Sequence, residues 1–346
     1  MNIQINDCTI RDGGYLLAKN SPEDFIRGVF KGLIDGGVDI IENGFLQKKV
    51  SGETLVYSNS LDARKYMPDE ASASRFTGFC DNSRFSLDLL DECKGEAFEY
   101  LKISFAKHEA DAALEFVAGA KMKGYKVFVN PMDAPSYSFE ERSKMIKKIN
   151  QIKPYAFSIV DTFGTMYLDD LRGIFTQMDQ ELDRSIRIGL HSHNNLQLSN
   201  ALAEVMIDLA TVADRDIIVD SSLYGMGRGA GNASTEVIAS YLNRKHGKNY
   251  KIGILFDTIE KYIIPCRSDS KVDKWGYDLP MFVCGTLGAH VDNIFYMKKN
   301  NPCTANEMLK VIESLDSDKR KRYGANYSKT DFTDLNKACE QHKEQR

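Results

Sequence analysis

The feature that most constrains the fold is a regular alternation of short apolar segments with amphipathic ones, from residue 2 to about residue 245. Eight apolar segments have the length and composition of buried strands: 3–9, 38–45, 75–80, 100–105, 126–132, 156–162, 187–193 and 217–223. Eight strand–helix units in this length predict an α/β fold, the (β/α)₈ TIM barrel. A doubly wound open sheet is the alternative, but no G-x-G-x-x-G follows the first strand.

The first helical pattern has recognisable ends. It covers 21–37, with Ser21 as the expected N-cap and Pro22 as the first helical residue. The two glycines that close the segment are expected to end the helix.

The last 100 residues differ in character from the rest of the chain. Residues 262–293 are rich in aromatic and loop-forming residues, and a charged helical pattern follows them. We therefore predict a barrel domain at 1–246 and a C-terminal, mainly helical appendage at 247–346 that packs on the barrel.

Composition narrows the classes of partner. The 346 residues are 42% hydrophobic and 27% charged with a net charge of −4, which predicts a large core and gives no basis for binding nucleic acid or an anionic membrane. No apolar run approaches the roughly 20 residues that span a bilayer, and the N-terminus lacks the pattern of a signal peptide. The seven cysteines stand singly, without a CxxC pair. We expect a cytoplasmic protein, with a homo-oligomer as its quaternary state.

Polar residues gather where the predicted strands end. The strand-end segments are DCTIRDG (7–13), EN (42–43), DT (161–162), HSH (191–193) and YGMGRGAGN (224–232). In a TIM barrel the carboxyl ends of the strands form the catalytic face.

The sharpest motif is LHSHNN at 190–195. His191 and His193 project to the same side of a strand, because side chains at i and i+2 do so. Two imidazoles in this arrangement predict a metal site, with Asp12 as a carboxylate ligand and Asn232 as an amide ligand. Nitrogen and oxygen ligands without thiolate favour Mn²⁺ or Mg²⁺, with Co²⁺ as a further candidate, over structural zinc. The alternative is a pair of hydrogen-bonded core histidines.

These motifs together resemble the signature of the DRE-TIM metallolyases, the superfamily of 3-hydroxy-3-methylglutaryl-CoA lyase. The resemblance rests on DCTIRDG, IIEN (40–43), HSHN (191–194) and GMGRGAGN (225–232), in order along the chain. It makes Asp12, Arg11 and Glu42 the Asp-Arg-Glu of the family name. The stretches VDTFGTMY (160–167) and AGNASTE (230–236) are most similar to the 4-hydroxy-2-oxovalerate aldolase branch.

The resemblance implies a metal-stabilised enolate of a 2-oxo acid, formed when a C–C bond breaks or forms. Arg11 would donate hydrogen bonds to the enolate oxygen, and Glu42 would hold Arg11 in position. Asp7 would orient Arg11 or relay a proton. The expected partners are a pyruvate-like 2-oxo acid and an aldehyde.

The chain departs from the aldolase pattern at Tyr15, where that branch carries a histidine proposed as the base. A tyrosine with a pKa near 10 is a poor base at neutral pH. Tyr15 as proton carrier and Tyr15 as substrate-stacking residue both remain open.

Three further residues are expected to contact the substrate: Lys102, Thr162 and Asn130. Lys102 lies within a predicted strand, as an inward lysine that pairs with an acid or binds the substrate carboxylate. The alternative for Lys102 is a Schiff-base nucleophile.

The function predicted from the sequence is a divalent-metal-dependent aldolase, a carbon–carbon lyase for 4-hydroxy-2-oxo acids. The nearest rival is a Claisen-type synthase that joins an acyl-CoA to a 2-oxo acid. A non-haem iron oxygenase shares the two-histidine, one-carboxylate set, but the helix-rich pattern argues against it. A non-catalytic binding barrel is the rival from another class, and Tyr15 is its best support.

Overall fold

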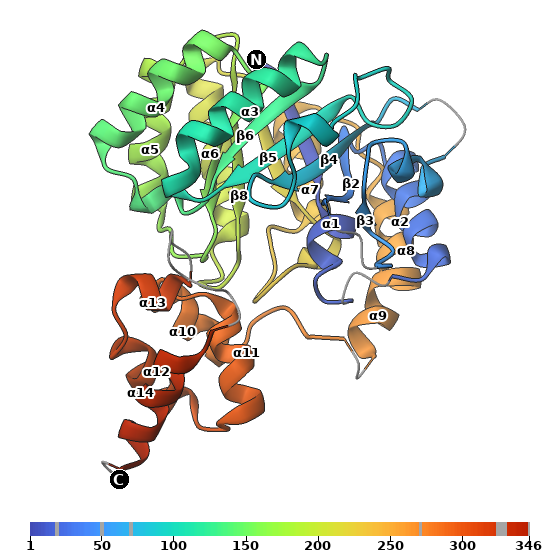
Figure 1. Ribbon diagram of the computed structural model, residues 1–346. Helices are drawn as coiled ribbons and strands as arrows, with labels where there is room; N and C mark the ends of the chain where they lie inside the picture. Colours follow the sequence, from blue (N-terminus) through green and yellow to red (C-terminus); the bar gives the residue numbers. More distant parts are fainter. Residues whose placement is uncertain (18–20, 49–51, 69–71, 270–271, 323–330, 345–346) are drawn as a thin grey trace.

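The computed structural model describes residues 1–17, 21–48, 52–68, 72–269, 272–322 and 331–344, and it shows a closed parallel barrel (Figure 1). Neighbouring strands follow the order β1-β9-β8-β7-β6-β5-β4-β2, and β1 pairs with β2 to close the barrel. The barrel strands are β1 (Ile3–Asp7), β2 (Ile40–Leu46), β4 (Arg75–Asp81), β5 (Tyr100–Phe105), β6 (Lys126–Pro131), β7 (Ala156–Asp161), β8 (Arg187–Ser192) and β9 (Ile217–Ser221). A short strand, β3 (Val56–Tyr57), pairs with the end of β2. The predicted TIM-barrel class is confirmed.

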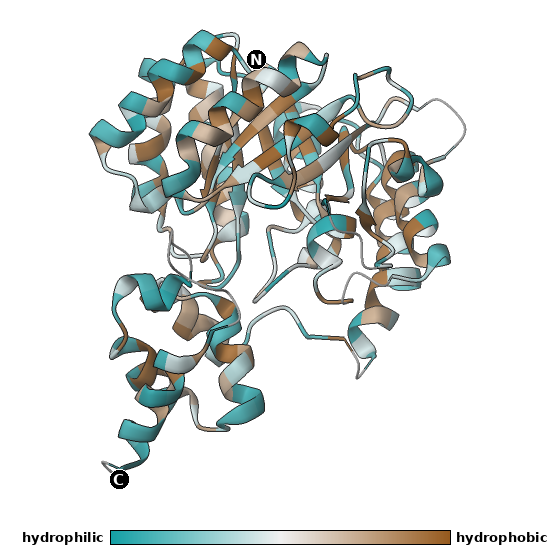
Figure 2. Ribbon diagram, viewed as in Figure 1, coloured by the Kyte–Doolittle hydropathy of each residue, from teal (hydrophilic) through white to brown (hydrophobic). Residues whose placement is uncertain are grey.

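Helices surround the barrel, and their apolar residues face the strands. They are α2 (Glu23–Asp35), α3 (Ala110–Met122), α4 (Phe139–Ile152), α5 (Leu168–Glu181), α6 (Ser199–Ala213), α7 (Thr235–His246) and α8 (Ile252–Thr258). Figure 2 shows hydrophilic residues on the outward faces of α3, α4 and α5. The connections from β2 to β4 and from β4 to β5 carry short 3₁₀ helices instead, η1 (Asp62–Tyr66) and η2 (Leu87–Leu89). None of the described helices is long and apolar enough to cross a bilayer.

Helix α2 begins one residue later than predicted. Pro22 is its N-cap, and Ser21 makes no capping bond because it precedes that position. The C-cap is Gly36, and Gly37 follows it with a φ of +82°, so the predicted end of the helix is confirmed.

The barrel interior is layered. An apolar layer at the amino ends of the strands consists of Ile40, Tyr100, Phe128, Ala156 and Ile218. Two residues further along three of these strands lie Glu42, Lys102 and Asp220, whose side chains face the same way. All three are buried. The alternation of the strands therefore places a charged layer directly above an apolar one.

The barrel core extends beyond the predicted boundary at residue 246. Tyr250, Leu255, Ile263 and Trp275 belong to the same buried cluster as the barrel strands, and α8 packs against α2. The segment that looked like the start of an appendage therefore supplies the last barrel helix. Its short length and aromatic, loop-rich continuation obscured that role in the sequence.

A separate C-terminal unit begins at α10. It consists of α10 (Leu279–Leu287), α11 (Val291–Asn300), α12 (Ala305–Glu313), α13 (Ser317–Lys321) and α14 (Thr333–Glu344), which share a second apolar cluster. In Figure 1 this unit lies beside the end of the barrel at which α1 (Thr9–Gly13) is found. Two ion pairs join it to that end, Arg228 with Asp292 and Lys321 with Asp133.

The packing of α8 on α2 can be tested with two glycines. A Cβ added at Gly32 of α2 would come within 2.0 Å of Thr258 Oγ1 on α8. We predict that Gly32→Ala lowers the free energy of unfolding by about 1–3 kcal/mol through overpacking. A Cβ added at Gly173 on α5 would meet no described atom within 4 Å. Gly173→Ala should therefore raise the free energy of unfolding by about 0.5–1 kcal/mol. Urea unfolding measures both, and equal effects would contradict the packing.

Candidate active site

The DCTIRDG segment forms a short helix at the end of β1. The predicted strand 3–9 ends at Asp7, and α1 begins after Cys8. Every residue of α1 is buried. Gly13 permits this close packing, because a Cβ there would lie 2.8 Å from the sulfur of Met226. Helix α1 therefore presents Arg11 and Asp12 at the carboxyl end of the barrel.

Three of the predicted metal ligands converge. Asp12, His191 and His193 each offer one ligand atom, and these atoms lie within 4.8 Å of one another. Burial lowers the pKa of His193 to about 4, so its ring is neutral at pH 7 and keeps a lone pair for a metal. Burial acts to raise the pKa of Asp12, but Arg11 outweighs it and holds that pKa well below its usual range. Asp12 and His193 therefore have the protonation states that a divalent cation requires of its ligands.

Asn232, the fourth predicted ligand, lies beside this group. It faces His193 in an isolated β-bridge, and its Nδ2 donates to Asp12 Oδ2 at 2.8 Å. Two buried atoms, His193 Nδ1 and Asn232 Oδ1, have no hydrogen-bond partner within the described ranges. Leaving a buried polar atom unpaired costs about 1–3 kcal/mol. Both atoms are of the kind that bind a divalent cation, so the residues present fit a metal.

An unbroken chain of buried ionisable side chains, the buried charge chain, joins two of the predicted metal ligands. Its members in order are Asp12, Arg11, Glu42, Lys102, Asp220 and His191. The successive N–O distances are 2.8, 2.5, 2.5, 2.5 and 3.0 Å. Asn6 braces the middle, because its Nδ2 donates to Glu42 at 2.7 Å and to Asp220 at 2.8 Å.

The charges of this chain favour a cation at its open end. Burial acts to raise the pKa of Glu42 and of Asp220, but the neighbouring cations outweigh it and hold both pKa values below their usual range. With Asp12 also ionised, three carboxylates face Arg11 and Lys102, and the net charge is −1. A bound divalent cation would change the net charge of these groups to +1, and a 2-oxo acid monoanion would then neutralise it.

Asp220 is a functional residue that the sequence-based assignment missed. Its Oδ2 lies 3.0 Å from His191 Nδ1, which leaves Nε2 as the atom directed to a metal. A carboxylate on the far nitrogen commonly fixes the tautomer and orientation of a metal-binding histidine. The sequence contains one signal that could have identified Asp220: it lies in the predicted strand 217–223, two residues after Ile218 of the apolar layer, so both side chains face the barrel interior.

A cavity of about 110 Å³ lies at the carboxyl end of the barrel. The predicted site residues that line it are Arg11, Asp12, Tyr15, Asn130, Thr162, His191 and His193. Phe79, Asp81, Ser104, Arg228 and His290 line it as well. Arg228 belongs to the glycine-rich segment that was expected to form the metal side, whereas His290 comes from the C-terminal unit.

Tyr15 is packed among other side chains at the cavity wall. Its ring meets Phe45 edge-on at 4.9 Å, and the guanidinium of Arg228 lies 5.4 Å from its centre. Burial raises the pKa of Tyr15 above its ordinary value. The phenol is therefore protonated at neutral pH, which favours stacking over proton abstraction between the two predicted roles.

Four predicted site residues do not line the cavity: Asp7, Glu42, Lys102 and Asn232. Lys102 is fully buried, with Nζ bonded to Glu42 and Asp220, which is the acid-paired role foreseen as one alternative. The carboxylate of Asp7 accepts hydrogen bonds from Thr9 N and Thr235 Oγ1. Glu42 and Asp12, and not Asp7, are bonded to Arg11. The predicted orienting role of Asp7 is therefore taken by neighbours that β2 and α1 bring closer.

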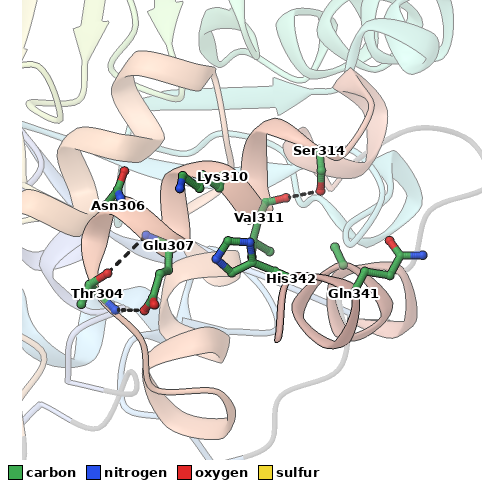
Figure 3. Close-up of a pocket in the computed structure, with 9 residues that line it drawn as sticks. Thr304, Asn306, Glu307, Lys310, Val311, Ser314, Gln341 and His342 are labelled. Carbon is green, nitrogen blue, oxygen red and sulfur yellow. Dashed lines mark hydrogen bonds between the residues drawn. The ribbon is translucent and has the colours of Figure 1, made fainter. Parts of the chain in front are cut away.

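A larger hollow lies elsewhere, between α12 and α14 of the C-terminal unit, with a volume of about 540 Å³ (Figure 3). Thr304 and Glu307 on its wall bond to each other's backbone and cap α12. The metal-ligating cluster found in the described residues lies at the barrel mouth and not here. The smaller cavity is therefore the candidate active site.

Comparison with known proteins places the chain among metal-dependent lyases by similarity. Residues 98–261 match the HMGL-like family model. The chain is 26% identical over 271 residues to the 4-hydroxy-2-oxovalerate aldolase of Bacillus thuringiensis (strain Al Hakam), which covers 76% of each chain. It is 24% identical to the oxaloacetate decarboxylase of Mycobacterium tuberculosis, over 78% of this chain and 79% of that protein.

A solved structure agrees at the level of fold. The HMG-CoA lyase of Bacillus subtilis superposes with a TM-score of 0.59 and 16% identity, over 75% of this chain and 91% of that one. The predicted resemblance to the DRE-TIM metallolyases is confirmed.

The metal assignment predicts the effect of removing one ligand. We expect His193→Ala to lower bound Mn²⁺ at least tenfold. Substitution of residues that only hydrogen-bond to a metal ligand already costs about 10–100-fold in metal affinity, and loss of the ligand itself should cost no less. His108→Ala, at a histidine outside the cavity, is the matched control. Elemental analysis after dialysis measures both, and unchanged metal in His193→Ala would remove this residue from the site.

Proposed function

Because this chain is a relative of the DRE-TIM metallolyases and carries an HMGL-like domain, we propose that it is a divalent-metal-dependent aldolase. It interconverts a 4-hydroxy-2-oxo acid with a pyruvate-like 2-oxo acid and an aldehyde. One observation carries the proposal: the ligand atoms of Asp12, His191 and His193 converge beside the Arg11 guanidinium in one small cavity. The predicted class, a carbon–carbon lyase of the aldolase type, is confirmed by the relatives.

Asp12, His191, His193 and Asn232 would hold the cation. We assign Mn²⁺ or Mg²⁺, with Co²⁺ as a third candidate, since the ligand set is nitrogen and oxygen without sulfur. When bound, the cation supplies a Lewis acid that polarises the keto group of the substrate.

Arg11 is the group that meets the developing negative charge. Its Nε is 2.5 Å from Glu42, its Nη1 is 2.8 Å from Asp12, and its guanidinium lies 4.5 Å from the centre of the Phe79 ring. The guanidinium is thus oriented before substrate arrives. A donor held in this way stabilises an enolate oxygen without reorganisation during the reaction.

Asn130 and Thr162 would contact the substrate from the opposite wall. Asn130 Oδ1 accepts a hydrogen bond from Ser158 at 3.2 Å, and Thr162 Oγ1 accepts one from the backbone N–H of Asp133 at 2.9 Å. These bonds fix both side chains at the cavity wall. We assign Tyr15 to packing against the bound substrate.

The relative named oxaloacetate decarboxylase bears on the rival functions. Loss of CO₂ from a 3-carboxylated 2-oxo acid and aldol cleavage both pass through the same enolate, so one site serves either. A Claisen-type synthase needs an acyl-CoA in addition. The predicted cytoplasmic location and homo-oligomer stay predictions.

Cleavage assays with and without chelator separate these functions. We predict that the Mn²⁺-loaded protein cleaves 4-hydroxy-2-oxopentanoate, that EDTA abolishes this activity, and that Mn²⁺ restores it. Borohydride added with substrate should leave no adduct, because Lys102 is bonded to two carboxylates. Cleavage that survives EDTA, with a borohydride-trapped mass shift on Lys102, would replace the metal mechanism by a Schiff base. Acetyl-CoA consumption without cleavage would favour the synthase.

A further inference from the structure

Aldol cleavage needs a group that accepts the proton of the C4 hydroxyl, and Tyr15, for which proton carrier was one of two open roles, is not suited to it. Tyr15 is a buried phenol with a raised pKa. Asp81, a carboxylate on the cavity wall, is engaged locally, because its Oδ1 accepts hydrogen bonds from Ser83 N at 3.0 Å and from Ser83 Oγ at 2.7 Å. His191 and His193 belong to the metal set. His290 also lines this cavity, and none of the functions described above has been assigned to its imidazole.

His290 is held firmly at the junction of barrel and C-terminal unit. It is 7% exposed and forms the N-cap of α11. Its backbone N–H donates to the carbonyl of Arg320 at 2.8 Å. Its Nδ1 lies 3.2 Å from the backbone nitrogen of Asp292 and 3.4 Å from Asp292 Oδ2. Because Nδ1 faces its own helix, the Cε1–Nε2 edge is the part of the ring directed away from α11.

The surroundings of His290 suit a ring that gains and loses a proton. A neutral ring can accept the Asp292 N–H at Nδ1 or donate from Nδ1 to Asp292 Oδ2, and an imidazolium pairs with the same carboxylate. Asp292 is in turn ion paired with Arg228. The ring of Phe163 also neighbours His290, with 6.3 Å between the ring centres. The ammonium of Lys321 lies 5.8 Å from the centre of the Phe163 ring and is ion paired with Asp133. The two cations nearest to His290 among the groups named here, Arg228 and Lys321, therefore carry their own counter-ions.

We propose that His290, supplied by the C-terminal unit, is the acid–base residue of this active site. This inference rests on the proposed function. In the structure Nδ1 accepts the Asp292 N–H; for the reaction the ring adopts the other tautomer, in which Nδ1–H faces Asp292 Oδ2 and Nε2 takes the C4 hydroxyl proton. The C3–C4 bond breaks, its electron pair forms the enolate of the 2-oxo acid, and the aldehyde leaves. The His290 imidazolium then returns the proton to C3, so the product is the 2-oxo acid and the ring is neutral again. No external oxidant or reductant takes part.

Two substitutions separate this role from a structural one. Asparagine is a preferred N-cap residue, so His290→Asn keeps the start of α11 and removes only the proton carrier. We expect its kcat for 4-hydroxy-2-oxopentanoate to fall about 100-fold or more, the usual scale of general acid–base catalysis, with bound Mn²⁺ unchanged. His290→Ala should regain activity when imidazole is added. His342→Asn, on α14 of the same unit, is the control and should keep wild-type activity.

The pH profile provides a second readout. The wild type should show an acidic limb in kcat/KM, because protonated His290 cannot accept the hydroxyl proton, and His290→Asn should lose this limb. A kcat of His290→Asn within threefold of wild type, with the limb retained, would overturn the inference alone. Loss of activity together with loss of Mn²⁺, without imidazole rescue, would also overturn it, by showing a structural role. A wild-type protein without cleavage activity would overturn the proposed function and this inference with it.

Discussion

The arrangement of the site depends on the buried charge chain from Asp12 to His191. Removing one partner of a buried ion pair typically costs about 3–5 kcal/mol, because the other charge is left uncompensated. The five links are therefore mutually dependent: Arg11 needs Glu42, Glu42 needs Lys102, and Lys102 needs Asp220. Since both ends of the chain are proposed metal ligands, the geometry of the candidate metal site is fixed by the same contacts that keep these side chains buried.

The barrel makes this chain possible through strand alternation. The apolar layer of Ile40, Tyr100 and Ile218 closes the amino end of the interior, and their i+2 neighbours carry the charges. The apolar layer separates the charged side chains from solvent at the amino end of the barrel, which strengthens the ion pairs of the buried charge chain. From the other side the C-terminal unit contributes His290 to the cavity wall and is tied there by the pair of Arg228 with Asp292.

Local patterns predicted much of this, and contacts between distant elements account for what was missed. The eight strands and the cluster of Asp12, His191 and His193 followed from short motifs and strand periodicity. The link of Asp220 to His191 depends on where β9 and β8 place their side chains inside the barrel, which one strand's pattern does not reveal. For the same reason the strand pattern does not reveal that Glu42 and Asp12, and not Asp7, are the groups bonded to Arg11. The share of α8 in the apolar core of the barrel was not predicted, because it is recognisable only from the packing of α8 on α2.

The most direct test of the account is proton exchange at a 2-oxo acid, because exchange reports the enolate without a second substrate. With Mn²⁺ bound, the wild-type protein should exchange the methyl protons of pyruvate with D₂O, measured by proton NMR. Arg11→Lys should bind Mn²⁺ normally yet exchange far more slowly, since a lysine cannot reproduce the planar fork that Glu42 and Asp12 hold in place. Exchange at the wild-type rate in Arg11→Lys, or no exchange in the Mn²⁺-loaded wild type, would contradict the central claim that the buried charge chain positions Arg11 to stabilise an enolate.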